Sequence, residues 1–281
     1  MGAQLTMSAV ECSAGGHTGG GLQPLYSART DVGRVREINE DRVFAGELPL
    51  LTDQLGASAR HLLVVADGVG GLERGEWASE KALTVVTAEL PIHLASHEPR
   101  EALRLALEAA NSLIWRRERS DAESWLGPAA TTVVAVIVDT VHLWWANVGD
   151  SRAYLVGEDR VERLTRDHSW VEDAVRGGAL TLEQARLSER RNVITRGVGF
   201  RPEVDVDTGG PRDLRPTDVV VLCSDGLHGL LTDEDIAHVV RRYPSAEAAE
   251  RLVDLSNERG GTDNISVIVC GFVAPQSENA S

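Results

Sequence analysis

The chain has 281 residues, of which 42% are hydrophobic, so it can bury one large core or two small ones. Its formal net charge of −15 argues against nucleic acid and against an anionic membrane as partners, since both bind basic surfaces. The three cysteines (Cys12, Cys223 and Cys270) have no Cys-x-x-Cys or Cys/His spacing, which excludes a recognisable zinc site. No segment is apolar for long enough to span a membrane and no signal peptide is recognisable, so we expect a cytoplasmic protein.

Polar tails are predicted at both ends of the chain. Residues 1–23 are rich in Gly, Ser and Thr, as flexible segments are, and residues 274–281 are short and polar. Between them, residues 24–273 contain no internal repeat and no linker, so we expect a single domain over this range.

Short apolar runs and amphipathic segments predict the elements of this domain. Runs rich in Val, Leu and Ile predict strands at 62–66, 131–139, 141–148, 152–156, 219–223 and 265–271. Helices are predicted at 73–90, 101–119, 170–177, 181–187, 232–241 and 246–258. Because the strands occur in blocks and the helices in pairs, the chain should form an α+β fold with antiparallel sheets rather than alternating β-α-β units.

Short turns connect the three central strands. Asp139-Thr140 joins the first to the second, and Gly149-Asp150-Ser151 joins the second to the third, as in an antiparallel meander. In the segment that follows, Thr181 predicts the N-cap of a helix, because Gln184 three residues later completes a capping box.

Four aspartates stand at the ends of short apolar runs: Asp67, Asp150, Asp225 and Asp263. An aspartate in such a place is oriented by the core and open to solvent. Several that converge would bind a divalent cation, because carboxylates are the oxygen ligands that Mg²⁺ and Mn²⁺ prefer. Each one alone is better explained by a tight turn, since Asp-Gly is a common turn sequence. Their conjunction favours a metal enzyme.

The segment Asp31–Asp41 strengthens this interpretation. It places Arg36 five residues before Asp41. A guanidinium group offers phosphate a planar fork of donors, here beside further carboxylates.

Six stretches of the chain together resemble one family, the metal-dependent serine/threonine protein phosphatases of type 2C in their compact bacterial form. The stretches are 30–41, 64–79, 131–155, 164–199, 219–230 and 260–269, in the family's order and spacing. The resemblance implies an α-β-β-α sandwich of two antiparallel β-sheets flanked by helices. It also implies a two-metal site at one end of the sandwich and a flap at about residues 168–195.

The resemblance implies roles for the aspartates. Asp67 would bridge two Mn²⁺ or Mg²⁺ ions, and the carbonyl of Gly68 would bind one of them. Asp225 and Asp263 would complete the sphere of the other ion. Two cations that share a carboxylate can lower the pKa of one bridging water towards neutrality, so this water would attack the phosphoester directly. The sequence has no Ser/His/Asp set and no Cys-x₅-Arg loop that would favour a covalent intermediate.

Further roles follow for the neighbouring polar residues. Glu40 and Asp41 would act on the metals directly or through bound water, and Arg36 would hold the substrate phosphate. A third metal is implied for bacterial members, but this chain lacks the expected aspartate shortly before residue 130. Asp150 or Asp121 would have to supply the ligand.

For each of three polar features, two interpretations remain open. Asp150 is equally well explained as a turn residue paired with Arg152. His168 belongs to the cap of a flap helix or touches the substrate. Arg190 and Arg191 form a solvated basic pair or receive an acidic phosphopeptide.

The function implied is hydrolysis of phosphoserine and phosphothreonine on proteins, in opposition to protein kinases. Phosphorylated proteins, including a cognate kinase, would be the partners of a monomeric enzyme. One alternative is a catalytically silent relative that acts as a regulatory phosphoprotein-binding module, but such a relative should have lost some of Asp67, Asp225 and Asp263. Another is a phosphatase dedicated to one regulatory partner, such as an anti-sigma-factor antagonist. Those usually carry sensor or membrane domains, for which the chain has no room.

Overall fold

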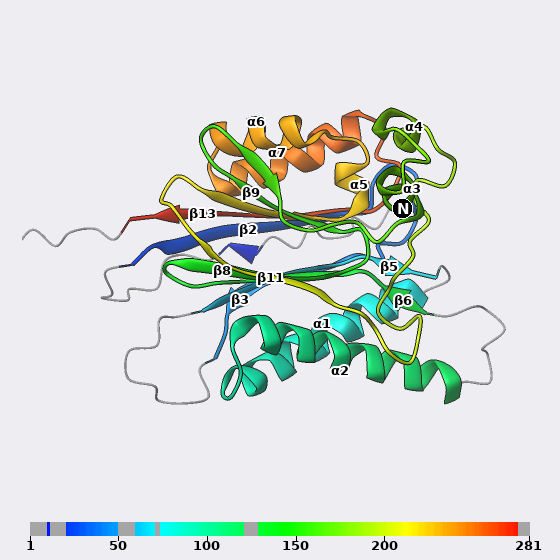
Figure 1. Cartoon of the computed structure of the whole chain (residues 1–281). Coiled ribbons are helices and arrows are strands. Elements are labelled where there is room, and N and C mark those ends of the chain that lie inside the picture. Colours follow the sequence, from blue (N-terminus) through cyan, green and yellow to red (C-terminus); the bar gives the residue numbers. More distant parts are fainter. Residues whose placement is uncertain (1–9, 12–20, 50–59, 71–73, 121–128, 275–281) are drawn as a thin grey trace, which may run out of the picture.

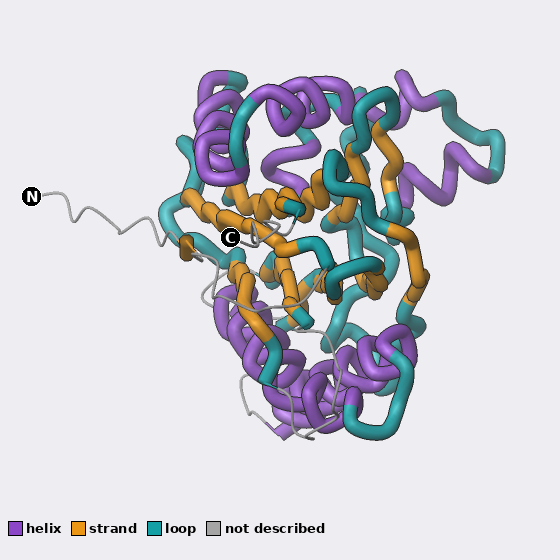
Figure 2. The backbone as a smooth tube through the Cα atoms, turned by 90° about the vertical axis from the view of Figure 1, so that its left-hand side faces the viewer, coloured by secondary structure: helices purple, strands orange, loops and turns teal. Residues whose placement is uncertain are grey.

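Two antiparallel β-sheets lie face to face, and helices cover the outer face of each sheet (Figure 1). The computed structural model describes residues 10–11, 21–49, 60–70, 74–120 and 129–274. Viewed along the layers, helices lie above and below a double layer of strands (Figure 2). This architecture confirms the α-β-β-α sandwich expected from the sequence.

The first sheet has six strands in the order β1-β2-β13-β12-β9-β10, each antiparallel to its neighbours. The strands are β1 (Val10–Glu11), β2 (Gln23–Asp31), β13 (Ile265–Val273), β12 (Val219–Cys223), β9 (Arg152–Val156) and β10 (Val161–Arg163). The central strand β12 is covered on both faces, which explains why its sequence is a continuous apolar run rather than an alternating one.

The second sheet has five strands in the order β11-β8-β7-β4-β3, again antiparallel. They are β11 (Asp207–Asp213), β8 (His142–Val148), β7 (Val133–Val138), β4 (His61–Ala66) and β3 (Arg42–Glu47). A two-stranded ribbon of β5 (Gly68–Val69) and β6 (Ala130–Thr131) extends one end of this sheet. Apolar side chains from both sheets, such as Leu63, Val136, Leu222 and Ile268, fill the space between them.

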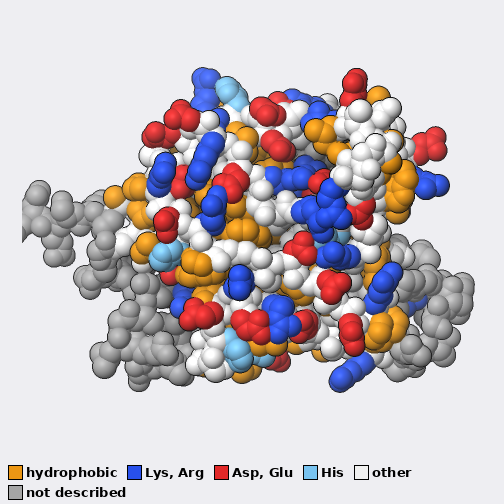
Figure 3. Space-filling view, viewed as in Figure 1, with side chains coloured by type: hydrophobic (Ala, Val, Ile, Leu, Met, Phe, Trp, Pro, Cys, Tyr) orange, Lys and Arg blue, Asp and Glu red, His pale blue; other side chains and the backbone are white. Residues whose placement is uncertain are grey.

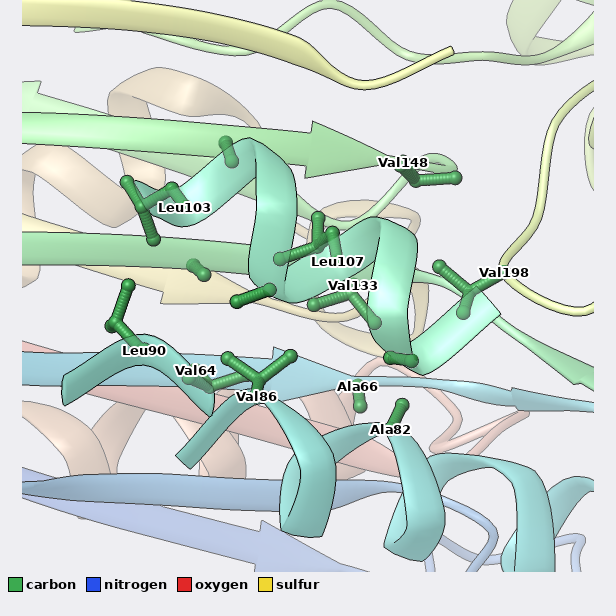
Figure 4. Packing of buried hydrophobic residues seen from close by; sticks show 14 of the residues in the cluster. Val64, Ala66, Ala82, Val86, Leu90, Leu103, Leu107, Val133, Val148 and Val198 are labelled. Atoms are coloured by element: carbon green, nitrogen blue, oxygen red, sulfur yellow. The ribbon is translucent and has the colours of Figure 1, made fainter. Parts of the chain in front are cut away.

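The long helices α1 (Arg74–Leu94) and α2 (Pro99–Ser120) cover the five-stranded sheet. Figure 4 shows Val86 of α1 and Leu107 of α2 packed with Val64 of β4 and Val133 of β7. The six-stranded sheet is covered by α6 (Asp233–Arg242) and α7 (Ser245–Glu258). None of the described helices is long and apolar enough to cross a membrane.

The three short helices lie at one end of the sandwich, on the right in Figure 1. They are α5 (Asp225–His228), α3 (Trp170–Arg176) and α4 (Leu182–Arg186), and the last two lie in the segment expected to be a flap, residues 168–195, which is called the flap below. The predicted capping box is confirmed, because Thr181 accepts a hydrogen bond from the Gln184 amide and the Gln184 side chain accepts one from the Thr181 amide. The domain boundaries expected near residues 24 and 273 stay predictions.

The predicted meander is wrong at its second turn. β7 and β8 pair as expected, but the turn at Gly149–Ser151 carries the chain from the five-stranded sheet to the six-stranded one. β9 is apolar on both faces, since Tyr154 packs towards the helices and Leu155 packs between the sheets. A strand of this kind needs cover on both faces, which the interior of the six-stranded sheet provides beside β12. The crossing places Asp150 at the end of the sandwich.

Candidate metal centre

Five aspartates from distant segments meet at the end of the sandwich that carries α5 and the flap. Asp67 lies between β4 and β5, Asp225 begins α5, and Asp150 lies in the turn where the chain changes sheet. Asp41 directly precedes β3, and Asp263 lies two residues before β13. The negative charges of Asp41, Asp225, Asp150 and Asp263 all act on Asp67. The fold therefore brings together the four aspartates singled out from the sequence, and Asp41 with them.

Burial and mutual repulsion raise the pKa values of these carboxyl groups. Burial is the larger cause for Asp67, whose pKa lies well above its ordinary value, and the four neighbouring charges raise it further. Burial likewise raises the pKa of Asp41 to about 7 and that of Asp225 to about 6, with a contribution from Asp263 in both cases. The pKa of Asp150 is also well above its ordinary value, first through burial and then through Asp225. Such a cluster is unfavourable unless positive charge joins it.

The donor set fits a hard divalent cation. Both carboxylate oxygens of Asp41 and the Oε1 of Glu40 are buried and make no hydrogen bond of regular geometry among the described residues. The hydroxyls of Ser224 and Ser266 lie close enough to lower the pKa of Asp41, but they do not offset its burial. Buried polar atoms normally have partners, and a cation would supply one. All the donors are oxygens, as Mg²⁺ and Mn²⁺ prefer. No three His, Cys, Asp or Glu side chains of the described segments surround one point closely enough to hold an ion by themselves.

The backbone of Asp67 is held by two threonines. The Thr132 amide and the Thr131 hydroxyl both donate to the Asp67 carbonyl, each over 2.8 Å. Gly68 is packed so closely that a Cβ atom would lie 2.3 Å from the carbonyl oxygen of Gly75. Only glycine fits there, and these contacts fix the direction of the chain at Asp67 and Gly68.

Arg36 reaches the carboxylate cluster from the β2–β3 connection. Its Nη2 donates to Oδ2 of Asp263 over 2.8 Å, and its side chain is 48% exposed. The negative charges of Glu40 and Asp225 also act on this guanidinium group. The structure therefore brings a half-exposed guanidinium group to the rim of the cluster.

The interpretation of Asp150 as a turn residue required an ion pair with Arg152, and this pair is not formed. Arg152 donates to the Asp167 carboxylate over 2.6 Å instead. The Asp150 carbonyl accepts a hydrogen bond from Nε2 of His228 over 2.9 Å, and its side chain is buried near the other aspartates. Asp121, the other residue considered for a third metal, lies outside the described residues.

His168 supports the turn that carries Asp150. Its Nδ1 accepts a hydrogen bond from the Gly149 amide over 3.0 Å, and its Nε2 lies 3.1 Å from Asp207. Ser169 and not His168 caps α3, so His168 lies next to the cap of this helix. The Arg190 guanidinium group lies 5.0 Å from the centre of the Trp170 ring, so these two residues of the flap contact each other.

Asn264 is a site residue that the sequence reasoning missed. Its side-chain amide donates to the carbonyls of Val32 and Ile38, and its Oδ1 accepts from the Glu40 amide. It therefore ties the whole β2–β3 connection to the start of β13. The available signal was a polar Asp-Asn pair directly before an apolar strand, which alone does not reveal a partner more than 200 residues earlier.

The buried Asp41 carboxyl predicts a pH-dependent stability of the metal-free protein. Since its folded-state pKa (about 7) exceeds its unfolded value (3.8), the folded state binds the extra proton between these pH values. The stability that Asp41 contributes is therefore lost as the pH rises towards 7. The variant Asp41→Asn has no such proton, so in EDTA its stability relative to wild type should rise between pH 5.5 and 8, by about 2 kcal/mol from Asp41 itself and further because Asp67 is repelled less.

Urea unfolding of both proteins at the two pH values measures this difference. The lowered pKa of buried His228, about 3, has the opposite effect on each protein, and it cancels in the comparison. If the difference in stability between the two proteins were the same at both pH values, the burial of the Asp41 carboxyl would not raise its pKa.

Comparison with known proteins places the chain among phosphatases. A family model described as Protein phosphatase 2C matches residues 30–174. The serine/threonine phosphatase stp of Listeria welshimeri is 33% identical over 247 residues, which are 86% of this chain and 93% of that protein. The solved serine/threonine phosphatase PstP/Ppp of Mycobacterium tuberculosis superposes with a TM-score of 0.75 at 33% identity, over 88% of this chain and 98% of that one. A structure of the PstP catalytic domain in complex with two manganese ions gives a TM-score of 0.74 at 33% identity, over 90% and 99% of the two chains.

Proposed function

Because this chain belongs to the protein phosphatase 2C family, we propose that the aspartate cluster at the end of the sandwich is its active site. The chain is a protein serine/threonine phosphatase that acts on phosphoproteins, and its cofactors are two Mn²⁺ or Mg²⁺ ions. The observation that carries the proposal is the buried Asp41 carboxylate, which makes no hydrogen bond of regular geometry among the described residues and lies beside the charges of Asp225 and Asp263. The relatives reported above are named phosphatases, and none of these names supports a catalytically silent module.

The ligands of the two ions are proposed as follows. Asp67 would bridge both ions, and the carbonyl of Gly68 would bind one of them. Asp225 and Asp263 would bind the other, while Glu40 and Asp41 would hold either ion directly or through water. When bound, the two cations supply the positive charge that neutralises the phosphate and lowers the pKa of a water molecule enough for it to attack. If a third ion binds in addition to these two, Asp150 would supply a ligand, since its buried carboxyl group lies beside Asp225.

The chain's own residues would orient the reactants. Thr131 and Thr132 keep the Asp67 backbone in place, so the carboxylate needs no rearrangement before reaction. Arg36 lies at the rim of the cluster and is half exposed, so its free donors can meet the phosphate as it enters. A guanidinium fork holds two phosphate oxygens at once and orients the phosphorus towards the attacking oxygen.

We also propose that the protein opposes a cognate kinase and works as a monomer. The function is tested by release of inorganic phosphate from a phosphothreonine peptide in Mn²⁺. Failure to release phosphate at any Mn²⁺ or Mg²⁺ concentration would contradict the proposal.

Substitution of Arg36 should impair substrate handling more than metal binding. Arg36→Ala removes the fork but no metal ligand, and charge-assisted hydrogen bonds contribute roughly 1.5–3 kcal/mol each. Because bound metals offset part of this loss, we expect the KM for a phosphothreonine peptide to rise about tenfold and kcat to fall. The freed Asp263 should leave Mn²⁺ affinity, measured by calorimetry, equal to or above that of wild type.

The conservative variant Arg36→Lys should recover only part of the lost affinity, because an ammonium group cannot reproduce the planar fork. A wild-type KM and kcat for Arg36→Ala would remove this residue from the site.

A further inference from the structure

Two large apolar side chains flank Arg36 on the surface of the β2–β3 connection. Val35 is 65% exposed and Ile38 is 43% exposed. Single exposed apolar residues are common on protein surfaces. These two are unusual in their place, since one precedes and the other closely follows the arginine that reaches the aspartate cluster.

The backbone that presents these side chains is held firmly. The Asn264 side chain donates to the carbonyls of Val32 (3.0 Å) and Ile38 (2.9 Å), which lie on either side of the loop tip. The Arg34 amide donates to the Gly261 carbonyl over 2.7 Å. Gly33 adopts a φ of 81°, and a Cβ atom there would lie 2.2 Å from the Asp263 carbonyl oxygen. The loop is thus packed against the segment that carries Asp263, and it presents Val35 and Ile38 without the entropy cost of ordering a free loop.

Exposed apolar side chains recur at the same end of the sandwich. The flap leaves Leu182 70%, Leu187 80% and Val193 47% exposed. Apolar side chains also lie between charged ones at the right-hand end of the face shown in Figure 3, beside the flap. The surroundings of the aspartate cluster are therefore partly apolar, in a chain whose net charge is −15.

We propose that Val35 and Ile38 bind an apolar side chain next to the phosphorylated residue of the substrate, and so set the sequence preference of the enzyme. The proposal rests on the proposed function, since it places the phosphate on Arg36. Neighbouring residues of an extended peptide are about 3.8 Å apart at their Cα atoms, so the residue beside the phosphorylated one comes within reach of the side chains beside Arg36. An apolar side chain of the substrate would gain affinity here by leaving water, without the need for a charged partner.

Two phosphothreonine peptides test this assignment against p-nitrophenyl phosphate, which has no flanking residues. One peptide carries leucine on both sides of the phosphothreonine and the other carries serine. We expect wild type to prefer the leucine peptide by about tenfold in kcat/KM, as burial of a leucine side chain allows. In the double variant Val35→Ser/Ile38→Ser this preference should fall to about twofold or less. Turnover of the leucine peptide relative to that of p-nitrophenyl phosphate should also be lower than in wild type.

Val141→Ser is the matched control, because Val141 is 48% exposed in the β7–β8 turn, outside the site. It should keep the full preference. Equal turnover of the two peptides by wild type would overturn the proposal. A preference for the leucine peptide that remains in the double variant, or that is lost to the same extent in Val141→Ser, would overturn it as well. If Leu187→Ser lost the preference and the double variant kept it, the flap would bind the flanking side chain and the proposal would be wrong. Failure of the proposed function is distinguishable, since p-nitrophenyl phosphate would then not be hydrolysed either.

Discussion

Asp225→Asn should lower kcat/KM for a phosphothreonine peptide by about a thousandfold or more, because the substitution keeps the shape of a proposed metal ligand and removes its charge. Asp225 begins α5 and lies among the charges of Asp67 and Asp263, where a neutral amide cannot replace a carboxylate as ligand to a hard cation. The metal-free variant should be at least as stable as wild type, since one charge of the repelling cluster is gone.

Asp213→Asn is a matched control for this variant. The Asp213 side chain is 91% exposed and lies near His142 in the five-stranded sheet, outside the cluster. It should retain wild-type activity. If Asp225→Asn were as active as Asp213→Asn, Asp225 would be a turn residue and not a ligand.

Removal of divalent metal should abolish hydrolysis of both p-nitrophenyl phosphate and phosphopeptide. The described residues offer carboxylates, which cannot neutralise a phosphate dianion, and Arg36 alone leaves most of the charge uncompensated. After EDTA treatment and dialysis, activity should return when Mn²⁺ or Mg²⁺ is added. Turnover that persists in EDTA would refute the two-metal assignment.

Metal should also stabilise the fold against the repulsion within the cluster. At a hundredfold excess over its dissociation constant, one bound ion stabilises the folded state by about 2.7 kcal/mol. With two ions bound to a domain of this size, we expect the melting temperature at pH 8 to rise by about 10–20 °C when Mn²⁺ is added to EDTA-treated protein. This measurement separates metal binding from catalysis.

The elements with a clear sequence period were predictable. β9 and β12 have the bounds expected from their apolar runs, and α6 begins directly after Thr232, which caps it. α1 was expected to end at Leu90, but it runs to Leu94 and includes Pro91. Apolar contacts of its buried face with α2 evidently outweigh the hydrogen bond that the proline lacks.

Other elements gave no clear signal in the sequence. β11 contains Gly209, Gly210 and Pro211, residues that usually interrupt a strand, and it forms because β8 supplies a ladder for it. β2 begins with Gln23-Pro24 and is only partly buried, so it lacked the apolar run that marks a central strand. The change of sheet at Gly149 depends on which faces are covered, which is a tertiary property.

The candidate site, like the fold, could be predicted from the sequence only in part. Asp67, Asp225 and Asp263 could be singled out because each stands at the edge of an apolar strand. The partners that hold them, such as Asn264 and Thr131, act through single hydrogen bonds across the fold. Such bonds leave no periodic trace in the sequence. The pairing of Arg36 with Asp263 likewise joins residues more than 200 positions apart.

The most direct measurement of the two-metal site is the number of Mn²⁺ ions that one chain retains at equilibrium. Equilibrium dialysis followed by elemental analysis should give about two tightly held ions for wild type and about one for Asp225→Asn, since Asp67 and Gly68 would still hold the first. The control Asp213→Asn should match wild type. If wild type retained no Mn²⁺, or if Asp225→Asn retained as many ions as wild type, the aspartate cluster would not be the metal centre.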